Sequence, residues 1–130
     1  MNTPTHVLIG MAAFGSPKAP RLTAAAALGA LLPDLPAILV VFWASRVQGL
    51  RAGDDLRDAV LLPVSWQALL APRHSVPLWA LVLAAGFYLR FPVLKAFAGS
   101  GLLHQACDFP VRADDPHRHF WPLSAWWFHS

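Results

Sequence analysis

The sequence contains no glutamate, a single cysteine and few charged residues. Charged side chains make up 13% of the 130 residues, about half of the roughly 25% that is typical of soluble domains. The lone Cys107 excludes an internal disulfide. The chain also has no Gly-rich phosphate loop, no C-x-x-C pair and no G-x-S-x-G motif. It therefore gives no support to a phosphate-binding loop, a thiol-redox pair or the nucleophile elbow of a serine hydrolase.

Most of the chain is apolar. Hydrophobic residues make up 56% of it, the mean hydropathy is +0.47 and the net charge is +3. Many basic residues fall in segments that connect apolar stretches, such as 18–21 and 46–57. Such placement is typical of charges that face lipid headgroups, whereas a nucleic-acid-binding protein gathers them on one face. We expect one membrane-associated domain, residues 1–130, with membrane lipid and no nucleic acid among its partners.

Proline and glycine divide the apolar sequence into short segments. Pro33 and Pro36 flank Asp34, so a helix that reaches this point must break or kink. The first residues, MNTPTH, lack the basic segment of a signal peptide, so insertion is expected through uncleaved helices. We expect an all-α, membrane-associated fold, a compact bundle of about five to six short, Pro-broken hydrophobic helices. Their expected ranges are 4–14, 21–32, 36–48, 55–70, 76–89 and 92–107, with Ser75 as the N-cap of the fifth.

Two titratable residues lie one helical turn apart in the apolar segment LLHQACDFP. His104 and Asp108 are separated by four positions, so on a helix they share one face, about 5–6 Å apart. Imidazole and carboxylate groups are natural ligands of zinc and similar divalent ions. The alternative is a structural hydrogen bond between the two side chains that closes the helix end. The spacing alone leaves both interpretations open.

A third titratable residue, Asp34, lies in the apolar segment LLPDLP. One interpretation is structural, because Asp34 precedes a helix with proline in its first turn and can act as the N-cap. The other is functional, because the break delivers a carboxylate to the middle of the bundle as a metal ligand. The two roles are compatible, since a carboxylate has two oxygens.

Histidines elsewhere in the chain are weaker candidates when each is taken alone. His6 lies in the first turn of an apolar helix, where a lone histidine is more often a core residue. His74 precedes a membrane-like helix and fits an interfacial turn. His117 and His119 alternate in a loop, so only one of them is expected to join a given site.

Taken together, these motifs resemble those of a known family. The sequence is similar to bacterial membrane-bound, metal-dependent hydrolases, also described as LexA-binding, inner-membrane-associated hydrolases. The resemblance covers almost the whole chain. The order of His, Asp, His, His-x-x-x-Asp and a later His is also similar to zinc-dependent phospholipase C and P1-type nucleases. The matching segments are Thr5 to Gly10, Leu28 to Asp34, His74-Ser75, His104 to Asp108 and Phe120 to Ser124.

The resemblance implies a divalent ion, zinc, and a location at the bacterial inner (cytoplasmic) membrane. It implies hydrolysis of a lipid or small-molecule substrate, with phosphoesters as candidates, and a general-base role for Asp34 or Asp108. The ligand glutamate of the phospholipase pattern has no counterpart here. The alternative is a non-enzymatic small membrane protein whose His/Asp pairs are structural or bind a partner. The implied metal ligands are His6, Asp34, His74, His104, Asp108 and His117.

Overall fold

The computed structural model describes residues 3–47, 71–109, 120 and 122–123. Within these ranges the regular structure is entirely helical and contains no strand, which confirms the all-α prediction. The predicted helix 55–70 and most of the tail lie outside the described residues. The other predicted helices form within about one residue of their expected ends. The elements are α1 (Thr3–Phe14), α2 (Pro20–Leu31), α3 (Leu35–Val47), the 3-10 turn η1 (Ala71–His74), α6 (Val76–Tyr88) and α7 (Pro92–Asp108).

Proline and capping groups set the helix starts. A proline occupies the first or second position of α2, α6 and α7, where its missing N–H is not needed and its fixed φ suits the helix. Ser75 is the N-cap of α6, as predicted, and its hydroxyl accepts a hydrogen bond from the backbone N–H of Leu78 at 3.2 Å. At the other end of α6, Arg90 has a φ of 51° and turns the chain back into α7.

The cap of α6 gives a first testable consequence. Replacing Ser75 by alanine leaves the N–H of Leu78 without this acceptor, so we expect a loss of about 1 kcal/mol in the free energy of unfolding. Because α6 begins directly after His74, the loss should be accompanied by weaker ordering of that histidine. Urea unfolding of Ser75→Ala beside Ser75→Thr, which keeps a hydroxyl, provides the measurement. Equal stability of the two variants would show that the cap contributes nothing.

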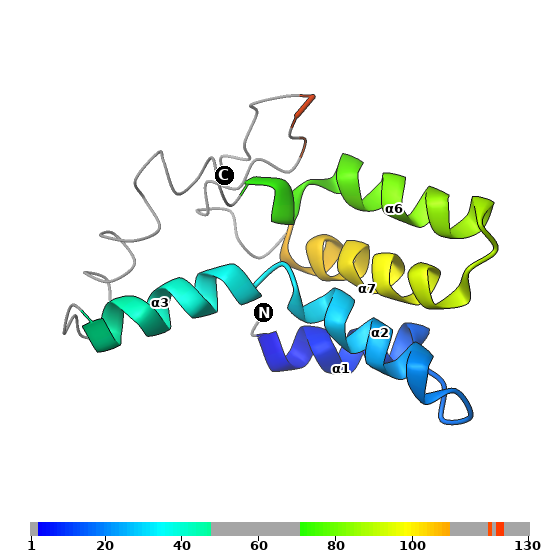
Figure 1. Ribbon diagram of the computed structural model, residues 1–130, viewed down its shortest axis with the longest axis horizontal. Helices are drawn as coiled ribbons and strands as arrows, with labels where there is room; N and C mark the ends of the chain where they lie inside the picture. Colours follow the sequence, from blue (N-terminus) through cyan, green and yellow to red (C-terminus); the bar gives the residue numbers. More distant parts are fainter. Residues whose placement is uncertain (1–2, 48–70, 110–119, 121, 124–130) are drawn as a thin grey trace.

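Helix α7 is the centre of the bundle. It packs against α1, α2 and α6, and α1 also packs against α2. Figure 1 shows α6 on one side of α7, with α1 and α2 on the other. Small side chains bring the helices close together: a Cβ at Gly101 would overlap the ring of Trp79, which lies flat against α7. The buried apolar side chains are Ala25, Ala26, Ala30, Trp79, Ala96 and Ala98.

The chain bends sharply between α2 and α3, at the predicted break. The segments Pro20–Leu31 and Leu35–Trp43 meet at an angle of 58°. Together they have the length and composition of a membrane span, but no single helix within the described ranges is long and apolar enough to cross a bilayer. In Figure 1, α3 extends away from the other four helices. It exposes four large apolar side chains, Ile38, Leu39, Phe42 and Trp43.

Candidate metal centre

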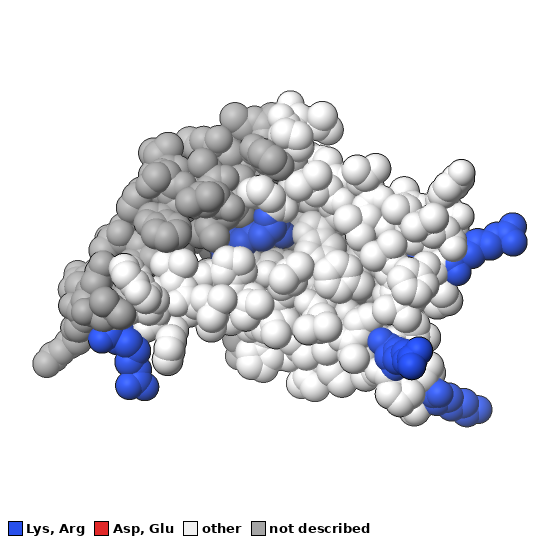
Figure 2. All heavy atoms as spheres, in the orientation of Figure 1, with Lys and Arg blue, Asp and Glu red and all other residues white. Residues whose placement is uncertain are grey.

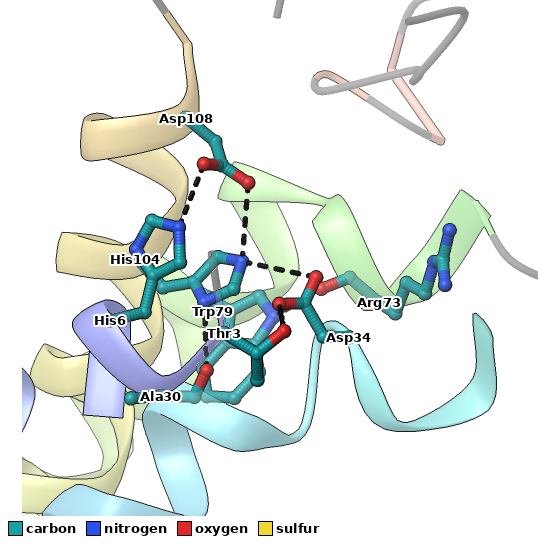
Figure 3. Close-up of polar contacts among 8 residues, drawn as sticks. All are labelled: Thr3, His6, Ala30, Asp34, Arg73, Trp79, His104 and Asp108. Carbon is teal, nitrogen blue, oxygen red and sulfur yellow. Dashed lines mark hydrogen bonds and ion pairs between the residues drawn. The ribbon is translucent and has the colours of Figure 1, made fainter. Parts of the chain in front are cut away.

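Five of the predicted site residues come together at one end of the bundle. His6 lies on α1, Asp34 in the turn before α3, His74 at the end of η1, and His104 and Asp108 on α7. None of the five has more than 6% of its surface exposed. Figure 3 shows His6, His104, Asp34 and Asp108 turned toward a common region. Residues distant in the sequence therefore meet in the interior of the bundle.

His104 occupies the middle of this cluster and is held by the backbone of α2. Its Nδ1 lies 2.7 Å from the carbonyl oxygen of Ala30. Because a carbonyl oxygen only accepts hydrogen bonds, Nδ1 carries the proton. In the neutral ring, Nε2 is then an acceptor with its lone pair directed away from α2. This is the arrangement found in metal-binding histidines, where a backbone carbonyl fixes the ring through the other nitrogen.

The lone pair of His104 faces two carboxylate oxygens. Nε2 lies 3.6 Å from Oδ1 of Asp34 and 3.5 Å from Oδ2 of Asp108. A charge-assisted hydrogen bond to a carboxylate is shorter, about 2.7–2.9 Å. The observed separations are close to the roughly 3.3–3.4 Å between ligands of a tetrahedral ion with bonds of about 2.0–2.1 Å. The two Nε2–oxygen separations are therefore compatible with three ligands of one tetrahedral ion.

Four buried side chains bring ligand atoms close to one another. One atom each from Asp34, His74, His104 and Asp108 lies within 4.8 Å of the other three. The rings of His74 and His104 have centroids 5.9 Å apart. Two buried carboxylates in such proximity repel one another, and burial itself disfavours their charge. A divalent cation satisfies both requirements, because it neutralises the two charges and replaces the lost hydration.

Hydrogen bonds from α1 hold the carboxylates in place. The hydroxyl of Thr3 donates to Oδ2 of Asp34 at 2.6 Å, which leaves Oδ1 facing His104. Nε2 of His6 lies 2.8 Å from Oδ1 of Asp108, which leaves Oδ2 facing His104. Each carboxylate therefore uses one oxygen for a contact with α1 and presents the other to the centre.

His6 differs from the other predicted ligands in its position. The four converging ligand atoms do not include one from His6, whose ring stacks against that of His104 with centroids 4.0 Å apart. Burial lowers the pKa of His6 and the neighbouring His104 lowers it further, while Asp108 opposes both effects. The lowered pKa keeps His6 neutral at pH 7. Its Nδ1 is buried and has no hydrogen-bond partner among the described residues.

Sequence reasoning missed the residues that support the cluster. Thr3 was not among the predicted site residues, and no side-chain pattern points to the carbonyl of Ala30. Two further polar residues of α7, Ser100 and Gln105, are buried without having been singled out; their position in an apolar helix beside His104 was the available signal. Cys107 is not one of the converging residues. His117 and His119 lie outside the described residues.

Comparison with known proteins adds no relative: no family profile matches the chain, and neither a curated protein nor a solved structure is significantly similar to it.

Proposed function

We propose that the protein binds a divalent metal ion through Asp34, His74, His104 and Asp108, and that it is a metal-dependent hydrolase. The observation that carries the metal site is the lone pair of His104, which faces two carboxylate oxygens at 3.5 and 3.6 Å. A divalent cation between these acceptor groups would neutralise both carboxylates and bind the lone pair of Nε2. Two imidazoles and two carboxylates are ligands that zinc accepts, and zinc is the proposed ion.

The residues around the centre have separable roles in such a reaction. A bound divalent ion supplies a Lewis acid and an acidified water. Thr3 and His6 orient the two carboxylates through the contacts described above. Asp34 or Asp108 is the proposed general base. Neutral His6 donates its Nε2 proton to Oδ1 of Asp108 and so holds this carboxylate in position, while its Nδ1 is unpaired among the described residues.

The proposed substrate is a phosphoester of a lipid or small molecule, and the proposed location is the bacterial inner membrane. Support for the substrate comes from the resemblance to phospholipase C and P1-type nucleases, which is an analogy of motif order. Support for the membrane comes from the apolar composition and from the exposed apolar side chains of α3. Exposure of these side chains to water is harder to explain than exposure to lipid, because soluble proteins rarely expose large continuous apolar patches.

A second candidate function rests on the contacts between helices. Thr3 joins α1 to Asp34, His6 joins α1 to Asp108, and His104 joins α7 to α2. These contacts are also what a non-enzymatic membrane protein would use to fix its helices. In that case the cluster would be a structural network without a metal, and its histidines would titrate without any ion being released.

Metal content and hydrolysis measured on the same samples distinguish the two functions. Elemental mass spectrometry of the purified full-length protein should give about one zinc or manganese ion per chain. The samples should hydrolyse bis(p-nitrophenyl) phosphate, lose this activity on treatment with a chelator, and regain it with zinc.

His104→Ala should lose metal and activity, while Cys107→Ala, a change on the same helix, should retain both. A wild-type protein without metal after incubation with micromolar zinc would overturn the proposal. Bound metal without hydrolysis of any phosphoester would overturn only the activity.

A further inference from the structure

A second concave site lies along α7, away from the metal centre. It is a groove of about 670 Å³ whose walls come from α1, α2, α6 and α7. This volume is within the roughly 300–1,000 Å³ of typical small-molecule sites. The groove is lined by apolar side chains apart from Lys95, and its lining includes Ala13, Phe14, Leu83, Phe87 and Leu103.

The groove and the metal centre use different faces of α7. Residues of the groove, such as Lys95, Gly99 and Ala106, recur at helical spacing along one face. His104 and Asp108 lie on another face and point toward α1 and α2. The groove extends along α7 from Pro92 to Ala106, a distance of about 21 Å at 1.5 Å per residue. It is therefore an elongated apolar site that is separate from the proposed metal site.

The charge of Lys95 indicates what the groove accepts. Its Nζ lies 5.1 Å from the centroid of the Phe87 ring, at the end of the groove near the turn between α6 and α7. Within residues 3–47 and 71–109 the only carboxylate side chains are Asp34 and Asp108. Both are buried in the cluster at the opposite end of α7. No described carboxylate therefore neutralises Lys95.

Other cations gather at the same end of the bundle. Lys18 and Arg21 lie in and after the turn between α1 and α2, Arg90 lies in the turn between α6 and α7, and all three are exposed. In Figure 2, basic side chains project from this end, and no acidic atom of a described residue is visible on the face shown. Lys95 in the groove and the other cations at this end of the bundle, without a described carboxylate nearby, favour a ligand with an acidic headgroup.

We propose that this groove binds a single-chain anionic amphiphile, with its acyl chain along α7 and its acidic headgroup at Lys95. The apolar walls and the length of the groove fit a long alkyl chain, whose burial is favourable by about 0.8 kcal/mol per CH₂. The ammonium of Lys95 fits a carboxylate or phosphate. Because the groove lies on its own face of α7, this binding does not require the metal.

Photo-crosslinking of the full-length protein tests the site. The probe is palmitic acid bearing a diazirine on its chain, compared with the methyl ester of the same molecule, and mass spectrometry locates the crosslinked residues. In the wild type, the acid should label groove residues of α1, α6 and α7. Labelling by the acid should exceed labelling by the ester about two- to fivefold, the range expected for one partly exposed charge pair.

Paired variants distinguish binding in the groove from nonspecific binding of the probe to other apolar surfaces. Ala13→Trp places a large ring in the groove and should lose most labelling, while Ala12→Trp, an exposed neighbour outside the lining, should keep it. Lys95→Gln should remove the preference for the acid and leave labelling by the ester unchanged. Three results would overturn the proposal. They are equal labelling of the two tryptophan variants, labelling that concentrates on α3, and absence of groove labelling in the wild type. Metal content measured in the same samples shows separately whether the metal site is intact.

Discussion

Replacing Asp108 by asparagine should weaken zinc binding by more than about 100-fold, the upper range for loss of a residue that only supports a ligand. Asp108 contacts two other members of the cluster, His6 at 2.8 Å and His104 at 3.5 Å. Asparagine keeps the size of the side chain and one oxygen but removes the negative charge. Competition with a chromophoric zinc chelator measures the change in affinity.

The same variant should change stability in opposite directions with and without metal. In the metal-free protein, Asp34 and Asp108 are two buried carboxylates with ligand atoms within 4.8 Å, and like charges at such a distance repel by about 3–4 kcal/mol. We expect Asp108→Asn without metal to be more stable than the wild type by about 1 kcal/mol, because the lost contact with His6 offsets part of the relieved repulsion. With saturating zinc the wild type should be the more stable protein, because only it gains the binding free energy.

This reversal distinguishes a metal site from a structural network. If the His/Asp contacts were hydrogen bonds that hold the helices together, Asp108→Asn would destabilise the protein in both conditions, because His6 would lose its charged partner. Thermal unfolding of the variant and the wild type, once with chelator and once with zinc, measures the sign of the stability difference in each condition. Cys107→Ala, which alters the neighbouring residue but no ligand, should show the same response to zinc as the wild type.

The helices were predictable from the sequence because proline and glycine mark their ends. Pro20, Pro77 and Pro92 each lie in the first turn of a helix, and Ser75 supplies the expected cap. The break at Asp34 was predictable for the same reason, since two prolines flank it. The angle of 58° between the two segments was not predictable, because it depends on packing between helices that local propensity does not specify.

The metal site was only partly predictable. The spacing of His104 and Asp108 places them on one face of any helix, so this pair follows from local geometry. The approach of His6, Asp34 and His74 depends on how α1, α2 and η1 pack around α7, and the motif resemblance rather than any residue pattern suggested it. Nothing in the sequence indicated that the carbonyl of Ala30 would fix the tautomer of His104. Backbone groups carry no signature in the sequence, although here the carbonyl of Ala30 determines that Nε2 of His104 faces the two carboxylates.

The close contact between α2 and α7 leads to the largest expected effect on stability. A Cβ at Gly29 would overlap the backbone oxygen of Phe97 and lie 2.8 Å from its carbonyl carbon. Because these are backbone atoms of a packed helix, α2 can accommodate the methyl group only by moving away from α7. Overpacking of this kind costs about 1–3 kcal/mol and sometimes more, whereas the gain in helix propensity from glycine to alanine is at most about 1 kcal/mol.

Gly99 provides a matched control on α7. A Cβ there would lie 2.7 Å from Cε1 of Phe14, which is the outer end of a side chain that is 37% exposed. We expect Gly99→Ala to change the free energy of unfolding by less than about 1 kcal/mol, since the propensity gain offsets the adjustment of the ring. Gly29→Ala should lose about 2 kcal/mol or more in the same urea titration.

Gly29→Ala should also disturb the metal centre, although Gly29 touches none of its ligands. The next residue, Ala30, accepts the hydrogen bond from Nδ1 of His104 at 2.7 Å, so moving α2 away from α7 lengthens this contact. Loss of a group that orients a ligand weakens metal binding by about 10–100-fold. Gly99→Ala leaves this contact in place and should bind zinc like the wild type. If Gly29→Ala lowered stability but kept full zinc affinity, the carbonyl of Ala30 would not be what orients His104, and the close packing of α2 on α7 would serve the fold alone.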